Sequence, residues 1–263
     1  MNTDILKKIR NAETLNEADI TQVISDILDG QSTASQIGAF LMGLSQRGET
    51  AEEITGAAKV LRARAKVITA PHGAIDCCGT GGDHSNSLNI STAVAFVVAA
   101  CGVPVAKHGN RAASSKSGAA DVLEALNINL DLSPSACEKA LSEIGFCFLM
   151  APHHHGSLKP LAALRKELGF RAIFNLLGPL ANPADTKLQL LGVFDRSFVR
   201  PMAESLLSLG SRHALVVHGS DGMDEITLAG ETYYAHLEDG KINEGVLKPT
   251  DFGLDLITAE DIR

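Results

Sequence analysis

Two loops rich in glycine and serine, each placed directly after a short apolar run, restrict most strongly what this chain can fold into. The first loop is GTGGD at 79–83, which leads to NIST at 89–92, and the second begins with KHGNR at 107–111. The apolar stretch 93–105 lies between them, and Gly102 divides it into a predicted buried helix and a predicted strand. Strand, loop, helix, strand and second loop in this order predict a parallel sheet with crossover helices.

The chemistry of the two loops favours anion binding. Glycines let backbone N–H groups approach a ligand, and Ser91 and Thr92 stand where the unpaired N–H groups of a helix would begin. Lys107 and Arg111 add full positive charges. One such loop could be a simple turn, but two loops at the carboxyl ends of neighbouring strands predict a site for two phosphate groups.

Charge and composition exclude several other classes of function. The formal net charge is −8 and no basic tail or stripe is present, which argues against non-specific binding to nucleic acid. The N-terminus reads as neither a signal nor a transit peptide, and no apolar run reaches membrane-spanning length. Five cysteines without C-x-x-C spacing indicate reduced thiols and a cytoplasmic location, with the adjacent Cys77 and Cys78 as strand residues.

Hydrophobic periodicity predicts two parts. Residues 1–68 read as a small helical domain, in which Asn16 begins one helix, Ser32 precedes a second, and Thr50 with Glu53 forms a capping box for a third. Residues 74–263 read as an α/β domain with a mostly parallel sheet flanked by helices. We expect its strands at 75–78, 103–107, 146–150, 187–194 and 213–217, its helices at 91–101, 117–126, 134–144 and 197–209, and a hairpin within 230–247 that turns at Asp239-Gly240.

Three further patterns carry candidate chemistry. Asp224 and Glu225 follow the loop 218–222 at the predicted carboxyl end of a strand, where both could reach a Mg²⁺ ion. The consecutive histidines 153–155 could suggest a metal site, but consecutive side chains diverge, so we prefer a loop near the active site. A basic edge formed by Arg165, Lys166 and Arg171 is predicted to face a partner, although a solvated face is the simpler interpretation for Lys166.

Six strings of residues carry a resemblance to a known family: GTGGD (79–83), NIST (89–92), KHGNRAASSKSG (107–118), RKELG (165–169), FNLLGPLANP (174–183) and VHGSDGMDE (217–225). On these strings the chain resembles the anthranilate phosphoribosyltransferases of tryptophan biosynthesis along its whole length. The resemblance implies a homodimer formed through the helical domain, joined by part of 160–183. It also implies transfer of the phosphoribosyl group from phosphoribosyl pyrophosphate (PRPP) to the amine of anthranilate, without a covalent nucleophile.

The resemblance also implies roles for particular residues. The expected magnesium ligands are Ser91, Asp224 and Glu225, and the expected contacts of anthranilate are Gly79, Asn110 and Arg165. The expected PRPP-binding residues are Gly79, Gly82, Asp83, Ser87, Asn89, Ile90, Ser91, Thr92, Lys107, His108, Gly109, Asn110, Arg111, Ala112, Ala113, Ser114 and Ser115. No nucleic acid or membrane partner is expected.

The chain departs from the family pattern at a few places. Ser87 replaces the usual Thr, Ala119 replaces a phosphate-binding Ser, and Gly156-Ser157-Leu158 replaces the usual segment after the histidines. The family's large domain continues past the equivalent of Arg263, so we expect an incomplete α/β domain with an uncovered hydrophobic face. Two alternatives therefore stay open: a truncated, inactive remnant that only dimerises, and an enzyme similar to a pyrimidine nucleoside phosphorylase.

Overall fold

The N-terminal part of the molecule is a bundle of four helices. A computed structural model describes residues 1–83, 85, 87–111 and 118–262. The helices are α1 (Thr3–Arg10), α2 (Glu17–Leu28), α3 (Ala34–Arg47) and α4 (Ala51–Ala63). Asn16 and Thr50 cap α2 and α4 as predicted, and Glu53 completes the predicted capping box. Helix α3 begins after Ser32 as predicted, and its cap is Thr33, whose hydroxyl accepts from the backbone N–H of Gln36.

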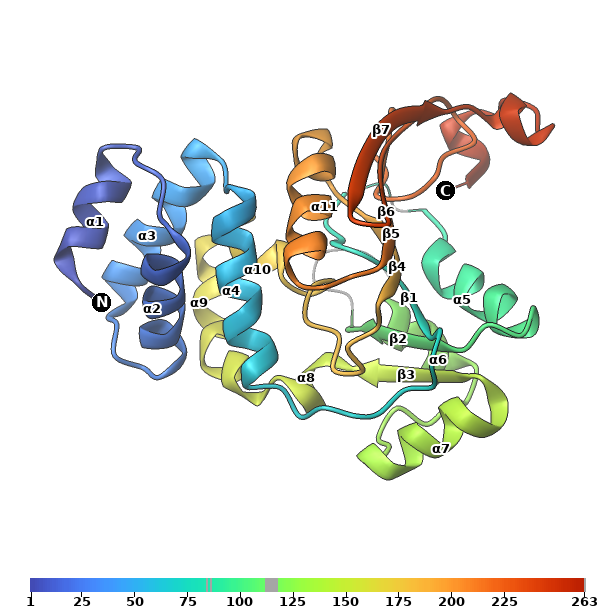
Figure 1. Ribbon diagram of the computed structural model, residues 1–263, viewed down its shortest axis with the longest axis horizontal. Coiled ribbons are helices and arrows are strands. Elements are labelled where there is room, and N and C mark those ends of the chain that lie inside the picture. The colour runs from blue at the N-terminus through green and yellow to red at the C-terminus, as the bar shows by residue number, and fades with distance from the viewer. Residues whose placement is uncertain (84, 86, 112–117, 263) are drawn as a thin grey trace.

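The C-terminal part is built on one sheet of seven strands, in the order β3-β2-β1-β4-β5-β6-β7 (Figure 1). The five strands β1 (Ile75–Gly79), β2 (Val105–Gly109), β3 (Phe146–Met150), β4 (Leu188–Gly192) and β5 (His213–Gly219) run parallel. The antiparallel hairpin of β6 (Thr232–Glu238) and β7 (Lys241–Leu247) completes the sheet. The mostly parallel sheet and the hairpin at Asp239-Gly240 confirm the prediction.

The strand order reverses direction at β1. The chain proceeds from β1 outward through β2 to β3 on one side, and then returns to place β4 and β5 on the other side. The carboxyl ends of β1 and β4 lie in register, with Gly79 opposite Gly192. Crevices at such a reversal are where ligands bind in open α/β sheets.

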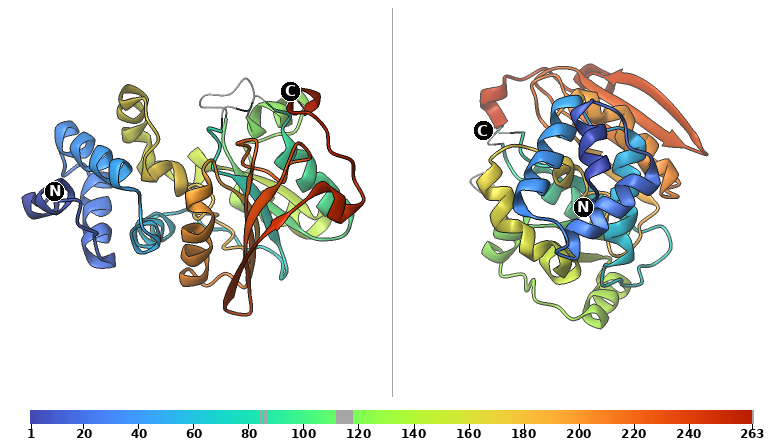
Figure 2. Two further views of the ribbon diagram at one scale, coloured as in Figure 1. Left: turned by 90° about the horizontal axis from the view of Figure 1, so that it is seen from above. Right: turned by 90° about the vertical axis from the view of Figure 1, so that its left-hand side faces the viewer.

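Helices cover both faces of the sheet (Figures 1 and 2). The helices that follow β1 are α5 (Ile90–Ala100), α6 (Ala119–Ala125), α7 (Pro134–Ile144), α8 (Ala151–His154), α9 (Ala162–Leu168), α10 (Ile173–Leu176) and α11 (Val199–Ser208), with short 3₁₀ turns η1 (Gly156–Leu161), η2 (Arg196–Phe198), η3 (Pro249–Phe252) and η4 (Ala259–Ile262). Helix α11 packs between α4 and the strands β5 and β6, whereas α5 packs on β1 and β2 from the other face. The segment η1–α10 packs against α2 and α3, so it joins the N-terminal bundle in space.

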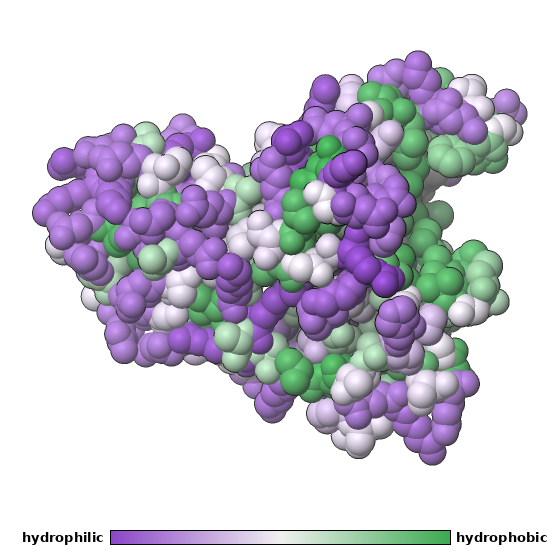
Figure 3. Space-filling view, in the orientation of Figure 1, coloured by the Kyte–Doolittle hydropathy of each residue, from purple (hydrophilic) through white to green (hydrophobic). Residues whose placement is uncertain are grey.

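The core runs without interruption from the bundle into the sheet. One cluster of buried side chains includes Phe40 of α3, Leu61 of α4, Met202 of α11 and Val216 of β5. In contrast, α5 is apolar on all sides, yet Val97 is 64% exposed. Figure 3 shows the resulting apolar surface over α5. This apolar surface belongs to a helix and not to a face of the sheet. Among the described residues, no helix combines the length and apolar character needed to cross a bilayer.

Several predicted boundaries differ from the observed ones. The second strand begins at Val105 rather than 103, because Gly102 and Pro104 end the preceding turn, and it continues to Gly109. Strand β5 likewise extends to Gly219, two residues beyond the prediction, and β4 is shorter than predicted. The last predicted helix, 197–209, is observed as the turn η2 followed by α11.

Candidate active site at the carboxyl end of the sheet

Two glycines make room for a carboxylate residue at the reversal point of the sheet. A Cβ atom added at Gly79 would overlap the carboxylate of Asp224, and one added at Gly192 would overlap its backbone carbonyl. The backbone N–H of Gly81 donates to Oδ2 of Asp224 at 2.8 Å, and both Gly81 and Gly82 have positive φ. The glycines of the first loop therefore hold Asp224 directly over the ends of β1 and β4.

Three carboxylates gather at this edge: Asp83, Asp224 and Glu225. Burial, and secondarily the charge of Asp83, raise the pKa of Asp224 to about 6. Burial, and secondarily the charge of Asp224, raise the pKa of Glu225 to about 8. Burial is thus the main cause of both shifts, and repulsion between neighbouring carboxylates is the second cause.

The N-terminus of α5 meets these carboxylates. The backbone N–H of Ser91 donates to Oε1 of Glu225 at 3.0 Å. The ammonium group of Lys107, which is 1% exposed, donates to the carbonyl of Cys77 and to Oγ of Ser91, the latter at 3.1 Å. The predicted residues Ser91, Lys107 and Glu225 thus form one connected group, with Asp224 beside it.

A fully buried polar network supports the end of β2, and sequence reasoning missed two of its members. Asp76 accepts from the backbone N–H of His108 at 3.1 Å and from the side-chain amide of Asn182 at 2.8 Å. The same amide donates to the carbonyl of Ala106 at 2.8 Å. Burial raises the pKa of Asp76 to about 6, although Lys107 opposes this. The sequence did carry one signal for this network: Asp76 is an acidic residue inside an otherwise apolar strand, directly before Cys77-Cys78.

The predicted PRPP-binding residues do not all face this group. The ring of His108 points into the protein, where Nδ1 lies 3.0 Å from the carbonyl of Gly178, and burial lowers its pKa to about 3. The guanidinium of Arg111 is paired with Glu124 and Asp121 of α6. Its neighbour Asn110 is exposed and accepts from the N–H of Arg111. This end of the second loop is therefore turned away from Asp224.

The remaining predicted positions are distributed around the site. Ile90 and Thr92 lie in the first turn of α5 after Asn89, and the buried hydroxyl of Thr92 has no partner within the described part of the chain. Ser87 shares a hydrogen bond with Ser85 at 3.0 Å. Gly109 is the last residue of β2. Four predicted residues lie outside the described residues: Ala112, Ala113, Ser114 and Ser115.

Two arginines of the predicted basic edge lie in half-buried or aromatic surroundings. Arg165 of α9 lies 5.8 Å from the ring centre of Phe174, and burial lowers its pKa. No carboxylate pairs with Arg165 among the described residues. Arg171 lies 4.4 Å over the ring of Phe194, and its side chain passes close to Gly82. No hydrogen bond of the described chain joins Arg165 to Gly79 or Asn110, the other two residues predicted to contact anthranilate.

Two histidines of the run 153–155 are held by backbone carbonyls. Nδ1 of His154 lies 2.7 Å from the carbonyl of Lys66, and Nε2 of His155 lies 2.9 Å from the carbonyl of Ala181. Burial lowers the pKa of both rings. The run is therefore not the predicted loop, because His153 and His154 end the short helix α8, and these contacts tie α8 to the linker and to the loop after α10.

The chain matches two models of one glycosyl transferase family. The helical bundle domain of the family matches residues 3–65, and its a/b domain matches residues 71–263. Curated relatives named anthranilate phosphoribosyltransferase include that of Rhodospirillum rubrum, 52% identical, and that of Azorhizobium caulinodans, 51% identical. Each alignment covers 98% of this chain and 75% of the relative, so the chain spans about three-quarters of their length.

Solved structures agree with the relatives. A crystal structure of anthranilate phosphoribosyltransferase from Thermus thermophilus superimposes with a TM-score of 0.91 at 40% identity, covering 99% of this chain and 78% of that one. The enzyme from Saccharomyces cerevisiae, in complex with PRPP and Mg, gives a TM-score of 0.87 at 27% identity and covers 100% and 77%. On fold, sequence and the full set of motif strings, the chain belongs to the anthranilate phosphoribosyltransferase family.

Proposed function

We propose that this chain transfers the phosphoribosyl group of PRPP to the amine of anthranilate, releasing pyrophosphate. The observation that carries the proposal is the group of Asp83, Asp224 and Glu225 at the reversal of the sheet, beside Lys107 and the N-terminus of α5. A pyrophosphate with a bound divalent cation matches this mixture of carboxylates, a buried cation and helix N–H groups.

The residues present fit a magnesium ion. Carboxylate and hydroxyl oxygens are ligands that Mg²⁺ accepts, and burial, followed by repulsion from neighbouring carboxylates, raises the pKa values of Asp224 and Glu225. We propose that Ser91, Asp224 and Glu225 hold the ion, as the resemblance implies. Bound there with PRPP, it would neutralise charge on the pyrophosphate leaving group.

The first loop and α5 would hold the pyrophosphate itself. The N–H of Ser91 donates to Glu225 in the present arrangement, and a Cβ added at Gly81 would meet no atom within 4 Å, so a ligand can approach the backbone there closely. Lys107, buried below Ser91, supplies a fixed positive charge to this end of the helix. Arg111 would join the ligand after leaving Glu124.

Arg165 is proposed to bind the carboxylate of anthranilate. Its guanidinium is half-buried, rests near an aromatic ring, and has no carboxylate partner within the described residues. A guanidinium pairs well with a planar carboxylate through two parallel hydrogen bonds. The reaction then depends on holding the amine against ribose C1 and on stabilising charge in the leaving group, with no covalent nucleophile.

The loss of anthranilate fluorescence on addition of PRPP and Mg²⁺ to the purified 263-residue protein tests the proposal. We expect turnover, and we expect Arg165→Ala to raise the KM for anthranilate roughly 10- to 100-fold, the effect of losing hydrogen bonds to a charged group. Lys166→Ala, at the exposed neighbouring position, is the matched control and should leave KM unchanged. Wild-type protein that folds but shows no turnover would refute the proposal.

We also propose that residues 1–68, joined by part of 160–183, form a dimerisation domain, and that 74–263 form the PRPP-binding domain. An apolar groove of about 500 Å³ between α1 and α3 supports this, since its lining includes Leu6, Ala39 and Met42, the last 50% exposed. Light scattering should report a dimer that Met42→Glu dissociates, whereas Lys139→Glu on α7 should not.

A cytoplasmic location is proposed from the five cysteines, which are all free thiols. Mass spectrometry after rapid alkylation in cells checks the thiol state. Recovery of oxidised cysteines at these positions would contradict it.

A further inference from the structure

A group of two histidines and a glutamate with closely spaced ligand atoms lies at the end of the sheet opposite the candidate active site. It consists of His213 at the first position of β5 and His236 and Glu238 near the end of β6. Each offers one ligand atom, and the three atoms lie within 4.8 Å of one another. Strand β5 is seven residues long, so this end lies about 20 Å from the site at Gly219.

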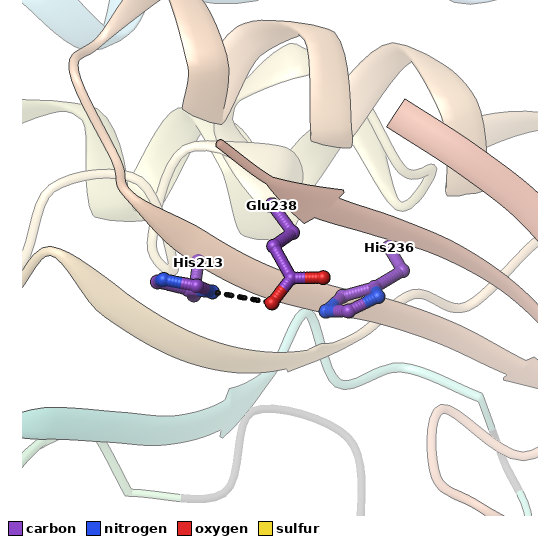
Figure 4. Close-up of side chains that lie close together, drawn as sticks. All are labelled: His213, His236 and Glu238. Atoms are coloured by element: carbon purple, nitrogen blue, oxygen red, sulfur yellow. Dashed lines mark ion pairs between the residues drawn. The ribbon is translucent and has the colours of Figure 1, made fainter. Parts of the chain in front are cut away.

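We propose that His213, His236 and Glu238 bind a zinc ion. The strand register builds the group: His213 pairs directly with Glu238, and His236 lies two residues before Glu238, on the same face. Figure 4 shows the carboxylate of Glu238 between the two imidazole rings. Oε1 of Glu238 is 3.7 Å from Nδ1 of His213.

The identity of the ligands favours zinc over magnesium. Two imidazole nitrogens and one carboxylate form a ligand set that zinc uses together with a water molecule. Magnesium prefers oxygen ligands and keeps several waters, so it should stay with the carboxylates at the other end of the sheet. A tetrahedral zinc site with bonds of about 2.0–2.2 Å needs ligand atoms about 3.4 Å apart, which small side-chain rotations would achieve from the present arrangement.

The surroundings leave the group accessible. The side chain of His213 is 39% exposed and that of Glu238 is 52% exposed, so an ion can enter from solvent and keep a bound water. Lys241 lies opposite Glu238 in the register of β7, but it is exposed and makes no ion pair in the described part of the chain. A bound ion would clamp the first residue of β5 to the end of β6.

Zinc titration of the metal-stripped 263-residue protein tests this site. We expect one zinc ion at the cluster, at least tenfold weaker binding in His236→Gln and in Glu238→Gln, and loss of this binding in His213→Gln/His236→Gln. His72→Gln, which changes an exposed histidine outside the cluster, should bind like the wild type. Because every variant keeps Asp83, Asp224 and Glu225, zinc bound by those carboxylates cancels in the comparison.

Two additional readouts identify the ligands. The Co²⁺-substituted protein should show visible bands of a nitrogen and oxygen site without thiolate charge transfer, and these bands should vanish in the double variant. Zinc should raise the unfolding temperature of the wild type more than that of the double variant. Equal zinc binding by wild type and double variant, or a thiolate band that survives in both, would overturn the proposal. If the double variant fails to fold, the two single variants decide in the same way.

Discussion

Two buried carboxylate groups in this molecule have opposite surroundings. In the helical bundle, Glu53 is completely buried. Its carboxylate accepts hydrogen bonds from the backbone N–H groups of Leu15 and Thr50 and from the hydroxyl of Thr50. The guanidinium of Arg47 donates to both carboxylate oxygens of Glu53. At the edge of the sheet, Asp224 accepts one backbone N–H, from Gly81, and lies among other carboxylates. The first group is saturated with donors and the second is not.

The difference separates a structural carboxylate from a ligand-binding one. Glu53 joins the start of α2, the end of α3 and the start of α4 through bonds that the protein itself supplies. Burial raises the pKa values of Asp224 and Glu225 because no equivalent set of donors surrounds them. The shortage of hydrogen-bond donors around Asp224 and Glu225 therefore indicates a site that binds a cation.

The largest expected effect follows from removing Glu53. Glu53→Ala leaves the buried guanidinium of Arg47 without its anionic partner, and breaking a buried ion pair in this way costs about 3–5 kcal/mol. Urea unfolding followed by circular dichroism measures the loss. Glu52→Ala, at the exposed neighbouring position, removes one hydrogen bond from the N–H of Glu17 and should cost only about 0.5–1.5 kcal/mol. Equal losses of unfolding free energy in the two variants would mean that Glu53 is not a structural carboxylate.

Asp224→Asn should have the opposite effect to Glu53→Ala: it should reduce turnover without reducing the free energy of unfolding. We expect at least a roughly 100-fold loss of turnover, since a ligand of the proposed ion is removed. In metal-free buffer the free energy of unfolding should stay the same or rise, because the folded protein loses a buried, repelled charge. Steady-state kinetics and urea unfolding on the same preparation measure both quantities.

The response to magnesium checks the same variant. Added Mg²⁺ should stabilise the wild type by binding the folded state, and it should stabilise Asp224→Asn much less. If Asp224→Asn unfolds more easily than the wild type in metal-free buffer, then Asp224 is a structural carboxylate like Glu53.

Gly192→Ala tests whether the position of Asp224 depends on a glycine beneath it. The added Cβ would overlap the carbonyl of Asp224, and such overpacking typically costs about 1–3 kcal/mol. We also expect weaker stabilisation by Mg²⁺, since the backbone of Asp224 must shift. Gly178→Ala is the control because a Cβ there meets no atom within 4 Å. Thermal unfolding with and without Mg²⁺ distinguishes a displaced site from a merely weakened core.

The sequence predicted the fold well where short-range patterns decide it. Apolar runs, capping residues and the Asp239-Gly240 turn located most helices and strands within two residues, because those signals act locally. The place of β4 beside β1, which creates the reversal, depends on contacts between distant segments. The register of Gly79 with Gly192 could therefore be seen only in the folded molecule.

The candidate site was predictable in its residue types and less so in its orientations. From the sequence alone, the glycines and Lys107 indicate anion binding, and the Asp224-Glu225 pair indicates cation binding. Nothing local shows that Arg111 pairs with Glu124, or that Asp76 and Asn182 meet beneath the site. The cluster at His213 was not predictable for the same reason, since His213 lies 23 residues before His236 and 25 before Glu238, and they meet through the register of two strands.

The smallest expected effect is on the pH dependence of stability and concerns His108. This buried histidine lies directly below the site and belongs to neither of the two carboxylate groups. Burial lowers its pKa from an ordinary 6.5 to about 3, so the folded protein binds fewer protons than the unfolded chain between these two values. Stability from this ring is therefore complete above pH 6.5 and is lost as pH falls. Between pH 6.5 and 5.5 the loss amounts to about 1 kcal/mol.

His108→Gln should remove that pH dependence. Asp76 contributes with the opposite sign, because its raised pKa makes folding less favourable as pH rises, but it is present in both proteins and cancels in the difference. Urea unfolding at pH 6.5 and pH 5.5 should thus show the wild type losing about 1 kcal/mol more than the variant, with His72→Gln behaving as the wild type. Parallel curves for wild type and His108→Gln would mean that the ring keeps an ordinary pKa in the folded state and takes up its proton as pH falls from 6.5 to 5.5. His108 would then supply positive charge below the phosphate site, and it would belong with the ligand-binding groups rather than with the structural ones.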